Sequence, residues 1–131
     1  MSIAITPFLR KVLYLDAATS GGAAILCIAG ASFLAPVTGL PQGLLFWAGV
    51  VLVPFVALLL ALARRTTAPR PILVDVAAIN ALWVAASLGL LASGLLEPTV
   101  LGIIFVVAQA LAVALFAALQ FSALRASPAR A

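Results

Sequence analysis

The chain has 131 residues, of which 66% are hydrophobic and 8% are charged, and its formal net charge at pH 7 is +4. Soluble domains contain about 45–50% apolar and about 25% charged residues, so this composition excludes a water-soluble globular protein and indicates a membrane protein. Histidine is absent, and only three residues are acidic. Because the commonest metal ligand and the usual general base are missing, we expect no enzymatic activity, no metal and no cofactor.

Four apolar segments are each long enough to cross a bilayer as a helix. In chain order they cover residues 12–35, 43–63, 72–96 and 99–124. A helix needs about 20 residues to cross a hydrocarbon core of about 30 Å, and it satisfies its backbone hydrogen bonds internally, as lipid requires. The sequence therefore predicts an all-α membrane protein whose 131 residues form a single transmembrane domain.

Turn-forming residues separate the four segments. They are Pro36, Gly39, Pro41 and Gly43 in the first connection, Pro69 and Pro71 in the second, and Glu97-Pro98 in the third. Short connections force neighbouring helices to run antiparallel. We therefore expect an up-down-up-down bundle of four transmembrane helices, in which the first two and the last two segments form hairpins.

A short similarity links the starts of the first and third segments. Leu15-Asp16-Ala17-Ala18 resembles Val74-Asp75-Val76-Ala77, and basic residues precede each stretch. Two hairpins of the same orientation would form a parallel repeat about an axis along the membrane normal. A chance match within Ala- and Leu-rich sequence explains the similarity equally well, so both interpretations stay open.

The basic residues predict the orientation of the bundle. All seven lie in the two terminal regions and in the middle connection, namely Arg10, Lys11, Arg64, Arg65, Arg70, Arg125 and Arg130. Basic connections stay in the cytoplasm, which predicts a bacterial inner membrane protein with both termini inside. The lipid bilayer is the expected partner, and the basic end would contact anionic headgroups. Because orientation already accounts for the few cations, we do not expect nucleic-acid binding.

Two acidic residues lie within the apolar segments. Asp16 and Asp75 are placed about one helical turn inside the cytoplasmic boundary. A carboxylate in a span is costly, and by default it suggests a proton or ion path. The structural alternative is that each carboxylate pairs with Arg64, Arg65 or Arg70, or lies favourably at the positive N-terminal end of its own helix. We favour the structural interpretation and keep proton coupling as the alternative.

Three uncharged polar residues lie deeper in the apolar segments. Helical spacing places Asn80 and Ser87 on one face of the third segment, and Gln109 lies in the fourth. Ser87 lies nine residues before Leu96 and Gln109 lies ten residues after Thr99, so an antiparallel hairpin brings Ser87 and Gln109 to the same depth. We predict a hydrogen bond between them, with bonding between helices favoured over contact with a ligand.

Two further features concern helix packing. Small residues form a stripe along the first segment, which predicts close contact with another helix, either in the same protomer or in a dimer. The stripe consists of Ser20, Ala24, Cys27 and Ala31. Pro54 lies in the interior of the second segment, where the missing N–H predicts a kink.

The chain, including Asn80-Ala81-Leu82-Trp83 in its third segment, is similar to uncharacterised four-span integral membrane proteins of bacteria. Its length and span count also resemble the small multidrug resistance family and the DoxX-like proteins, and that resemblance covers architecture alone. The small multidrug resistance family uses a membrane-embedded Glu in its first helix, where this chain has Asp16 nearer the boundary.

These observations lead to one expected function and two alternatives. We expect a non-catalytic helical bundle that serves as an accessory subunit of a larger membrane complex or assembles into a homo-oligomer. Resemblance to the small multidrug resistance family implies instead a proton-coupled transporter of lipophilic or cationic compounds. Resemblance to the DoxX-like proteins implies a protein that handles small lipids or quinones.

Overall fold

The computed structural model describes residues 2–126. Five helices and two short strands occur in this range. In chain order they are β1 (Ser2–Ala4), α1 (Pro7–Ala29), α2 (Ala31–Thr38), α3 (Gln42–Ala63), β2 (Thr67–Pro69), α4 (Arg70–Ser93) and α5 (Val100–Ala126). By length and composition α1, α3, α4 and α5 could each cross a membrane.

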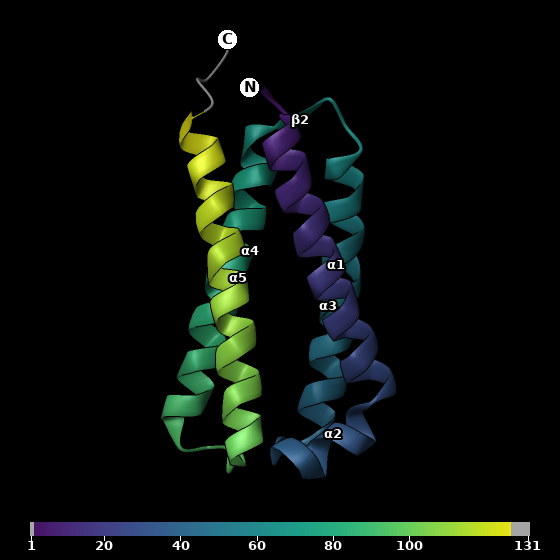
Figure 1. Ribbon diagram of the computed structural model, residues 1–131, viewed down its shortest axis with the longest axis vertical. Coiled ribbons are helices and arrows are strands. Elements are labelled where there is room, and N and C mark those ends of the chain that lie inside the picture. Colours follow the sequence, from purple (N-terminus) through teal and green to yellow (C-terminus); the bar gives the residue numbers. More distant parts are fainter. Residues whose placement is uncertain (1, 127–131) are drawn as a thin grey trace.

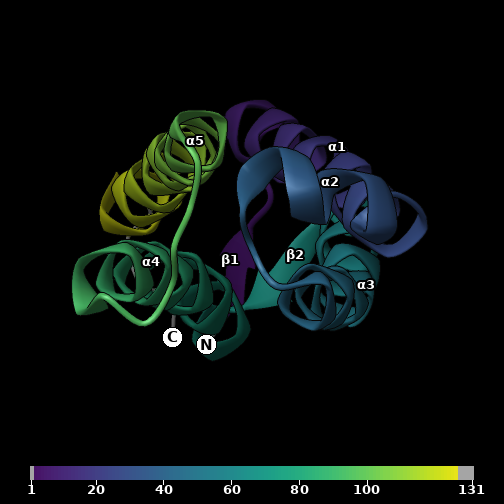
Figure 2. The same cartoon turned by 90° about the horizontal axis from the view of Figure 1, so that it is seen from below.

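The four long helices lie side by side along the longest axis of the molecule (Figure 1). α1 packs most closely against α3, and α4 packs most closely against α5. Seen from one end, the two helix pairs face each other (Figure 2). The arrangement agrees with the predicted bundle of two hairpins, and the N-terminus, the α3–β2 connection and the end of α5 lie at the same end (Figure 1).

The first predicted segment, 12–35, differs most from the structure. α1 begins at Pro7, where the Thr6 side chain accepts a hydrogen bond of 3.1 Å from the Leu9 amide, and it ends at Ala29. Gly30 separates it from α2, a short helix that the sequence did not predict and that contains Pro36. Proline at the first helical position and a Ser or Thr cap are strong start signals, whereas glycine weakens a helix interior. The other predicted boundaries are within three residues of the observed ones.

The end that carries the termini is closed by two strands that the sequence did not predict. β1 pairs antiparallel with β2, and Ile3 lies opposite Ala68, with both side chains buried. Beside them the Arg10 guanidinium donates one hydrogen bond to the Ala63 carbonyl (2.9 Å) and one to the Arg65 carbonyl (3.0 Å). Arg10 thus caps the end of α3. Arg130 lies outside the described residues.

The opposite end is closed by α2 and the start of α5. Gly39 ends α2 with a φ of +72°, and a Cβ atom there would lie 2.6 Å from the Glu97 carbonyl oxygen. The Thr99 amide donates a hydrogen bond of 2.9 Å to the Thr38 carbonyl. At Gly102 a Cβ atom would lie only 2.0 Å from that same carbonyl oxygen. Glycine is therefore needed on both sides of this contact, which joins the first hairpin to the second.

Two members of the predicted stripe of small residues, Ala24 and Cys27, pack against α3 within the protomer. Ser20, Ala24, Cys27 and Ala31 are all buried. A Cβ atom at Gly49 of α3 would lie 2.9 Å from the Ala24 carbonyl oxygen, which shows how closely the two backbones approach. Such contacts are the usual means of association between apolar helices. Pro54 lies inside α3, as expected, with an exposed side chain.

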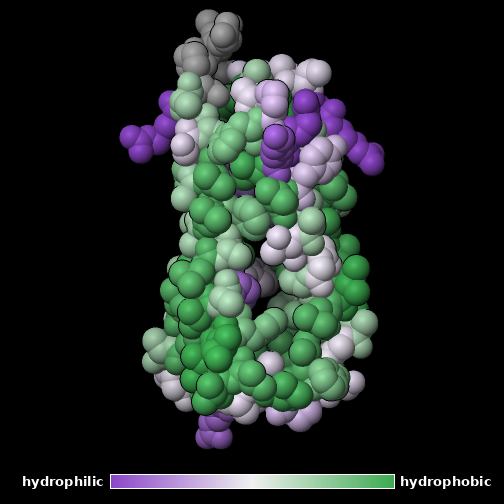
Figure 3. Space-filling model, viewed as in Figure 1, coloured by the Kyte–Doolittle hydropathy of each residue, from purple (hydrophilic) through white to green (hydrophobic). Residues whose placement is uncertain are grey.

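Apolar side chains between the hairpins are packed in two clusters, one near each end. The first includes Leu13 of α1, Leu59 of α3 and Val76 of α4, and the second includes Leu34 and Leu45. Between these levels the packing is thinner. Within the described residues, α3 has no buried residue between positions 50 and 58, and α4 has no buried residue after position 80. Figure 3 shows a recess at mid-height on one face, with a hydrophilic group at its edge.

Candidate functional site: a buried polar cluster between the hairpins

The Asp16 side chain is completely buried in the interior of the bundle, with 0% of its surface exposed. It lies nine residues after Pro7, which places its Cα about 14 Å along α1 at 1.5 Å per residue. Ser20 follows one turn later on the same face, and its hydroxyl donates a hydrogen bond of 3.1 Å to Asp16 Oδ1. α1 therefore supplies a carboxylate and a hydroxyl that already contact each other.

Two amides from the second hairpin complete the cluster. Asn80 of α4 donates to Asp16 Oδ2 at 2.7 Å, and Gln120 of α5 donates to the same oxygen at 2.8 Å. Asn80 also donates to Gln120 Oε1 at 2.9 Å. Asp16, Ser20, Asn80 and Gln120 are hereafter called the polar cluster. It connects α1 with both helices of the opposite hairpin.

Helical periodicity explains why these polar side chains point inward. On α1 Asp16 follows the buried residues Leu9 and Leu13 at spacings of three to four, and on α4 Asn80 follows Leu73 and Val76 in the same way. Residues at this spacing share one face of a helix. The polar cluster thus continues the first apolar cluster toward the middle of the bundle.

The chemistry of the polar cluster suits an ionised carboxylate. Asp16 accepts three hydrogen bonds from neutral donors, and such charge-assisted bonds are shorter and about twice as strong as neutral ones. Every buried side-chain nitrogen or oxygen in residues 2–126 has a partner. The two amides turn their nitrogens toward the carboxylate, whereas a metal ion would require their oxygens. No group of three or more metal-binding side chains occurs in the described part of the chain.

The predicted pairing of Asp16 with Arg64, Arg65 or Arg70 is wrong. Its partners are the members of the polar cluster. The reason is depth: α1 begins five residues earlier than predicted, so Asp16 lies further from the basic end of the bundle. The arginines donate to backbone carbonyls instead, Arg65 to Thr67 (3.0 Å) and Arg70 to the end of α5 (3.3 Å).

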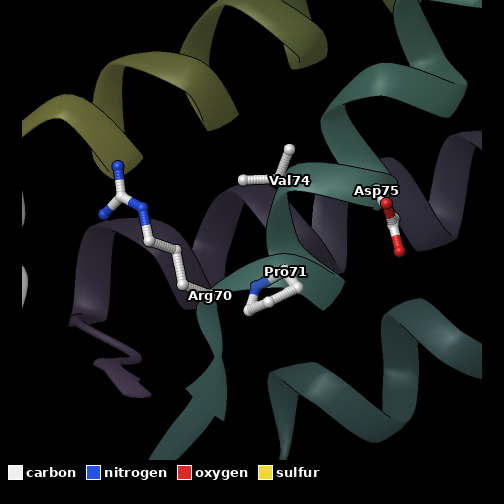
Figure 4. A pocket seen from close by; sticks show the side chains of 4 residues that line it. All are labelled: Arg70, Pro71, Val74 and Asp75. Carbon is white, nitrogen blue, oxygen red and sulfur yellow. The ribbon is translucent and has the colours of Figure 1, made fainter. Parts of the chain in front are cut away.

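Asp75 does not belong to the polar cluster. It is exposed on the outer face of α4, beside a shallow pocket that is also lined by Arg70, Pro71 and Val74. In Figure 4 its carboxylate points away from the Arg70 guanidinium, which extends toward α5. Asp16 and Asp75 therefore occupy different environments despite their similar sequence surroundings.

The predicted hydrogen bond between Ser87 and Gln109 is also wrong. Gln109 does bond across the α4–α5 hairpin, but its partner is the Trp83 indole, which donates to Gln109 Oε1 at 2.8 Å. The Ser87 hydroxyl donates to the Trp83 carbonyl at 2.7 Å, one turn back in its own helix. A serine hydroxyl is short and readily satisfied by the i−4 carbonyl, whereas the longer indole reaches the neighbouring helix.

Gln120 was not among the predicted polar positions, and Ser20 was predicted only as a member of the stripe of small residues. Two signals were available. Ser20 follows Asp16 by four residues, which places both on one face, and Gln120 follows Gln109 by eleven residues, which is about three helical turns. Neither signal identifies the partner on another helix, because that depends on how the helices are rotated.

Comparison with known proteins adds no family to this description. No family model, no curated protein and no solved structure matches the chain. The polar cluster must therefore be interpreted from its own geometry.

Proposed function

We propose that the protein is an integral membrane helical bundle whose outer surface contacts lipid. The observation that carries this proposal is an inverted distribution of side chains: large apolar residues face outward while a carboxylate and two amides are buried. Soluble proteins expose their charged residues and bury their largest apolar ones. The most exposed large apolar side chains are Ile25, Phe33, Trp47, Leu82, Leu95, Val100 and Leu111.

The charges support a bacterial inner membrane location with both termini in the cytoplasm. Hydrophilic groups gather at the two ends of the molecule, and apolar surface lies between them (Figure 3). The termini and the α3–β2 connection share one end, which carries the described arginines and Lys11, whereas Glu97 lies in the connection at the other end. This asymmetry is typical of a basic cytoplasmic side.

Within the membrane we propose a non-catalytic role, as an accessory subunit of a larger complex or as a self-assembling homo-oligomer. The polar cluster is saturated by bonds among its own members and joins the two hairpins. Such a cluster suits the fixing of a helix arrangement, since apolar helices have little hydrophobic drive to associate in lipid. The apolar outer faces are then available to neighbouring helices of a partner.

Two measurements test this proposal. Reporter fusions after Arg65 and after Pro41 should report opposite sides of the membrane, with the Arg65 fusion inside. Purification in a gentle detergent should yield a stoichiometric membrane partner or a homo-oligomer of defined mass. A monomer without partners would contradict the proposed role, and a protein that stays dissolved without detergent would contradict the membrane location.

A second candidate is a small proton-coupled transporter of lipophilic or cationic compounds. The observation that favours it is the position of Asp16, a buried carboxylate that has no basic partner among residues 2–126 and lies where α1 meets the opposite hairpin. Intramembrane carboxylates are frequent members of proton relays. In proteoliposomes with a proton gradient, Asp16→Asn should abolish uptake of a fluorescent lipophilic cation, whereas the control Asp75→Asn should retain it. Absence of uptake by the unmodified protein would contradict this candidate.

A further inference from the structure

We propose that Asp16 is a reversible proton-binding site in which the Ser20 hydroxyl serves both protonation states of the carboxyl group. This inference rests on the proposed membrane location of the bundle, but it holds for either of the two roles. It is based on the different hydrogen-bond partners of the two carboxylate oxygens. Oδ1 contacts only the Ser20 hydroxyl, whereas Oδ2 accepts both amides.

In the ionised form all three donors bond to the carboxylate with the geometry seen in the structure. Ser20 Oγ donates to Oδ1 at 3.1 Å, and the Asn80 and Gln120 amides donate to Oδ2 at 2.7 and 2.8 Å. A buried carboxylate requires this degree of hydrogen bonding to remain charged in apolar surroundings. The charge is thus stabilised without a cation.

The protonated form keeps the same side-chain partners and reverses one hydrogen bond. An incoming proton forms an O–H bond at Oδ1, and this new hydroxyl donates to Ser20 Oγ. The Ser20 hydroxyl then turns its own hydrogen away from Oδ1, and the i−4 backbone carbonyl, here that of Asp16, is the acceptor that serine commonly uses in helices. Oδ2 becomes the carbonyl oxygen and keeps both amide donors. The carboxyl group gains one proton, and its charge changes from −1 to zero.

No charged side chain of residues 2–126 forms a hydrogen bond with the polar cluster that could offset this change of charge. α3 carries no titratable side chain, and on the other packed helices the titratable groups of the described chain form no hydrogen bond to the polar cluster. These groups are Arg10, Lys11, Tyr14 and Cys27 on α1, Arg70 and Asp75 on α4, and Arg125 on α5. Within residues 2–126, none of these groups therefore compensates a change of charge at Asp16 through a hydrogen bond.

The packing indicates where the proton enters. Apolar side chains that include Leu9, Leu13 and Leu73 seal the polar cluster from the end that carries the strands. Ser20 lies on the other side of Asp16, toward the thinly packed middle, and at 7% it is the most exposed member of the cluster. The recess in Figure 3 opens at mid-height, where the packing is thinnest. Protons would reach Oδ1 from the middle of the bundle, past Ser20.

Infrared difference spectroscopy of the full chain in lipid vesicles tests this proposal directly. The difference between the spectra of the unmodified protein and of Asp16→Asn should contain the carbonyl stretch of one protonated carboxyl group, which appears and vanishes reversibly with pH and shifts in frequency in Asp16→Glu. The control Asp75→Asn should retain it. Circular dichroism should show unchanged helix content across the titration. No such band in the difference from Asp16→Asn, over the whole pH range in which the helices persist, would overturn the proposal.

The role of Ser20 is tested by two matched variants. Ser20→Ala removes the hydroxyl that bonds to Oδ1, so the carbonyl stretch assigned to Asp16 should shift in frequency. Ser20→Thr keeps the hydroxyl and should show this band at the frequency of the unmodified protein. Identical frequencies in all three proteins would overturn the role of Ser20. Neither experiment requires transport or a partner. Evidence against the subunit role or against the transporter role would therefore leave the proton-binding site untouched.

Discussion

The hydrogen bond between Asp16 and Asn80 offers a direct test of the polar cluster, because it joins the two hairpins through a single pair of side chains 2.7 Å apart. A double-mutant cycle with Asp16→Ala and Asn80→Ala isolates the energy of this pair from the separate costs of each truncation. A control cycle pairs Asp75→Ala with Asn80→Ala. Asp75 is exposed and is not a member of the polar cluster.

The expected coupling energy depends on the charge of Asp16. A hydrogen bond to a charged group contributes about 1.5–3 kcal/mol, whereas bonds between helices in a membrane protein average about 0.6 kcal/mol and reach about 1.7. Because Asp16 is fully buried and accepts three neutral donors, we expect about 2 kcal/mol in alkaline buffer. For a neutral carboxyl group the coupling would be nearer about 0.6 kcal/mol.

Reversible unfolding in mixed micelles, followed by circular dichroism, supplies the four unfolding free energies of each cycle. The control cycle should be additive within about 0.5 kcal/mol, as is usual for side chains without contact. A coupling for Asp16 and Asn80 no larger than that of the control would show that the two side chains do not interact in the folded bundle.

Three further predictions address the packing around the polar cluster. Gly102→Ala should lower the unfolding free energy by about 1–3 kcal/mol in mixed micelles, because the added Cβ would lie 2.0 Å from a carbonyl oxygen of α2. The control Gly89→Ala should not destabilise the protein, because a Cβ added at Gly89 has no atom within 4 Å. Arg10→Ala should speed hydrogen exchange in β1 and β2 through loss of its two bonds to carbonyls, whereas Lys11→Ala, with an exposed side chain, should leave exchange unchanged. Trp83→Phe should cost about 0.6 kcal/mol of unfolding free energy, and no change would show that its indole bond across the α4–α5 hairpin contributes nothing.

The contacts within the candidate site could not be predicted from the sequence, although its carboxylate and one of its amides were predicted as polar positions within the apolar segments. Asp16 and Asn80 stand out because polar residues are rare in apolar segments. Their mutual contact, over 64 residues of chain, was not predicted. Depth along a span can be counted from a sequence, but the count fails when a helix begins earlier than expected, as α1 does at Pro7. The same error produced the wrong arginine partners.

The four long helices, their pairing into hairpins and the basic end could be predicted from the sequence, because each follows from local properties: runs of apolar residues, short connections and the positions of Arg and Lys. The contacts among the polar side chains, the break at Gly30 and the pairing of β1 with β2 became visible only in the folded chain. These features depend on the rotation of each helix about its axis and on contacts between distant parts of the chain. A uniformly apolar helix has no strong preference for one inward face, so close packing at Gly49 and Gly102 and the donors around Asp16 fix that rotation.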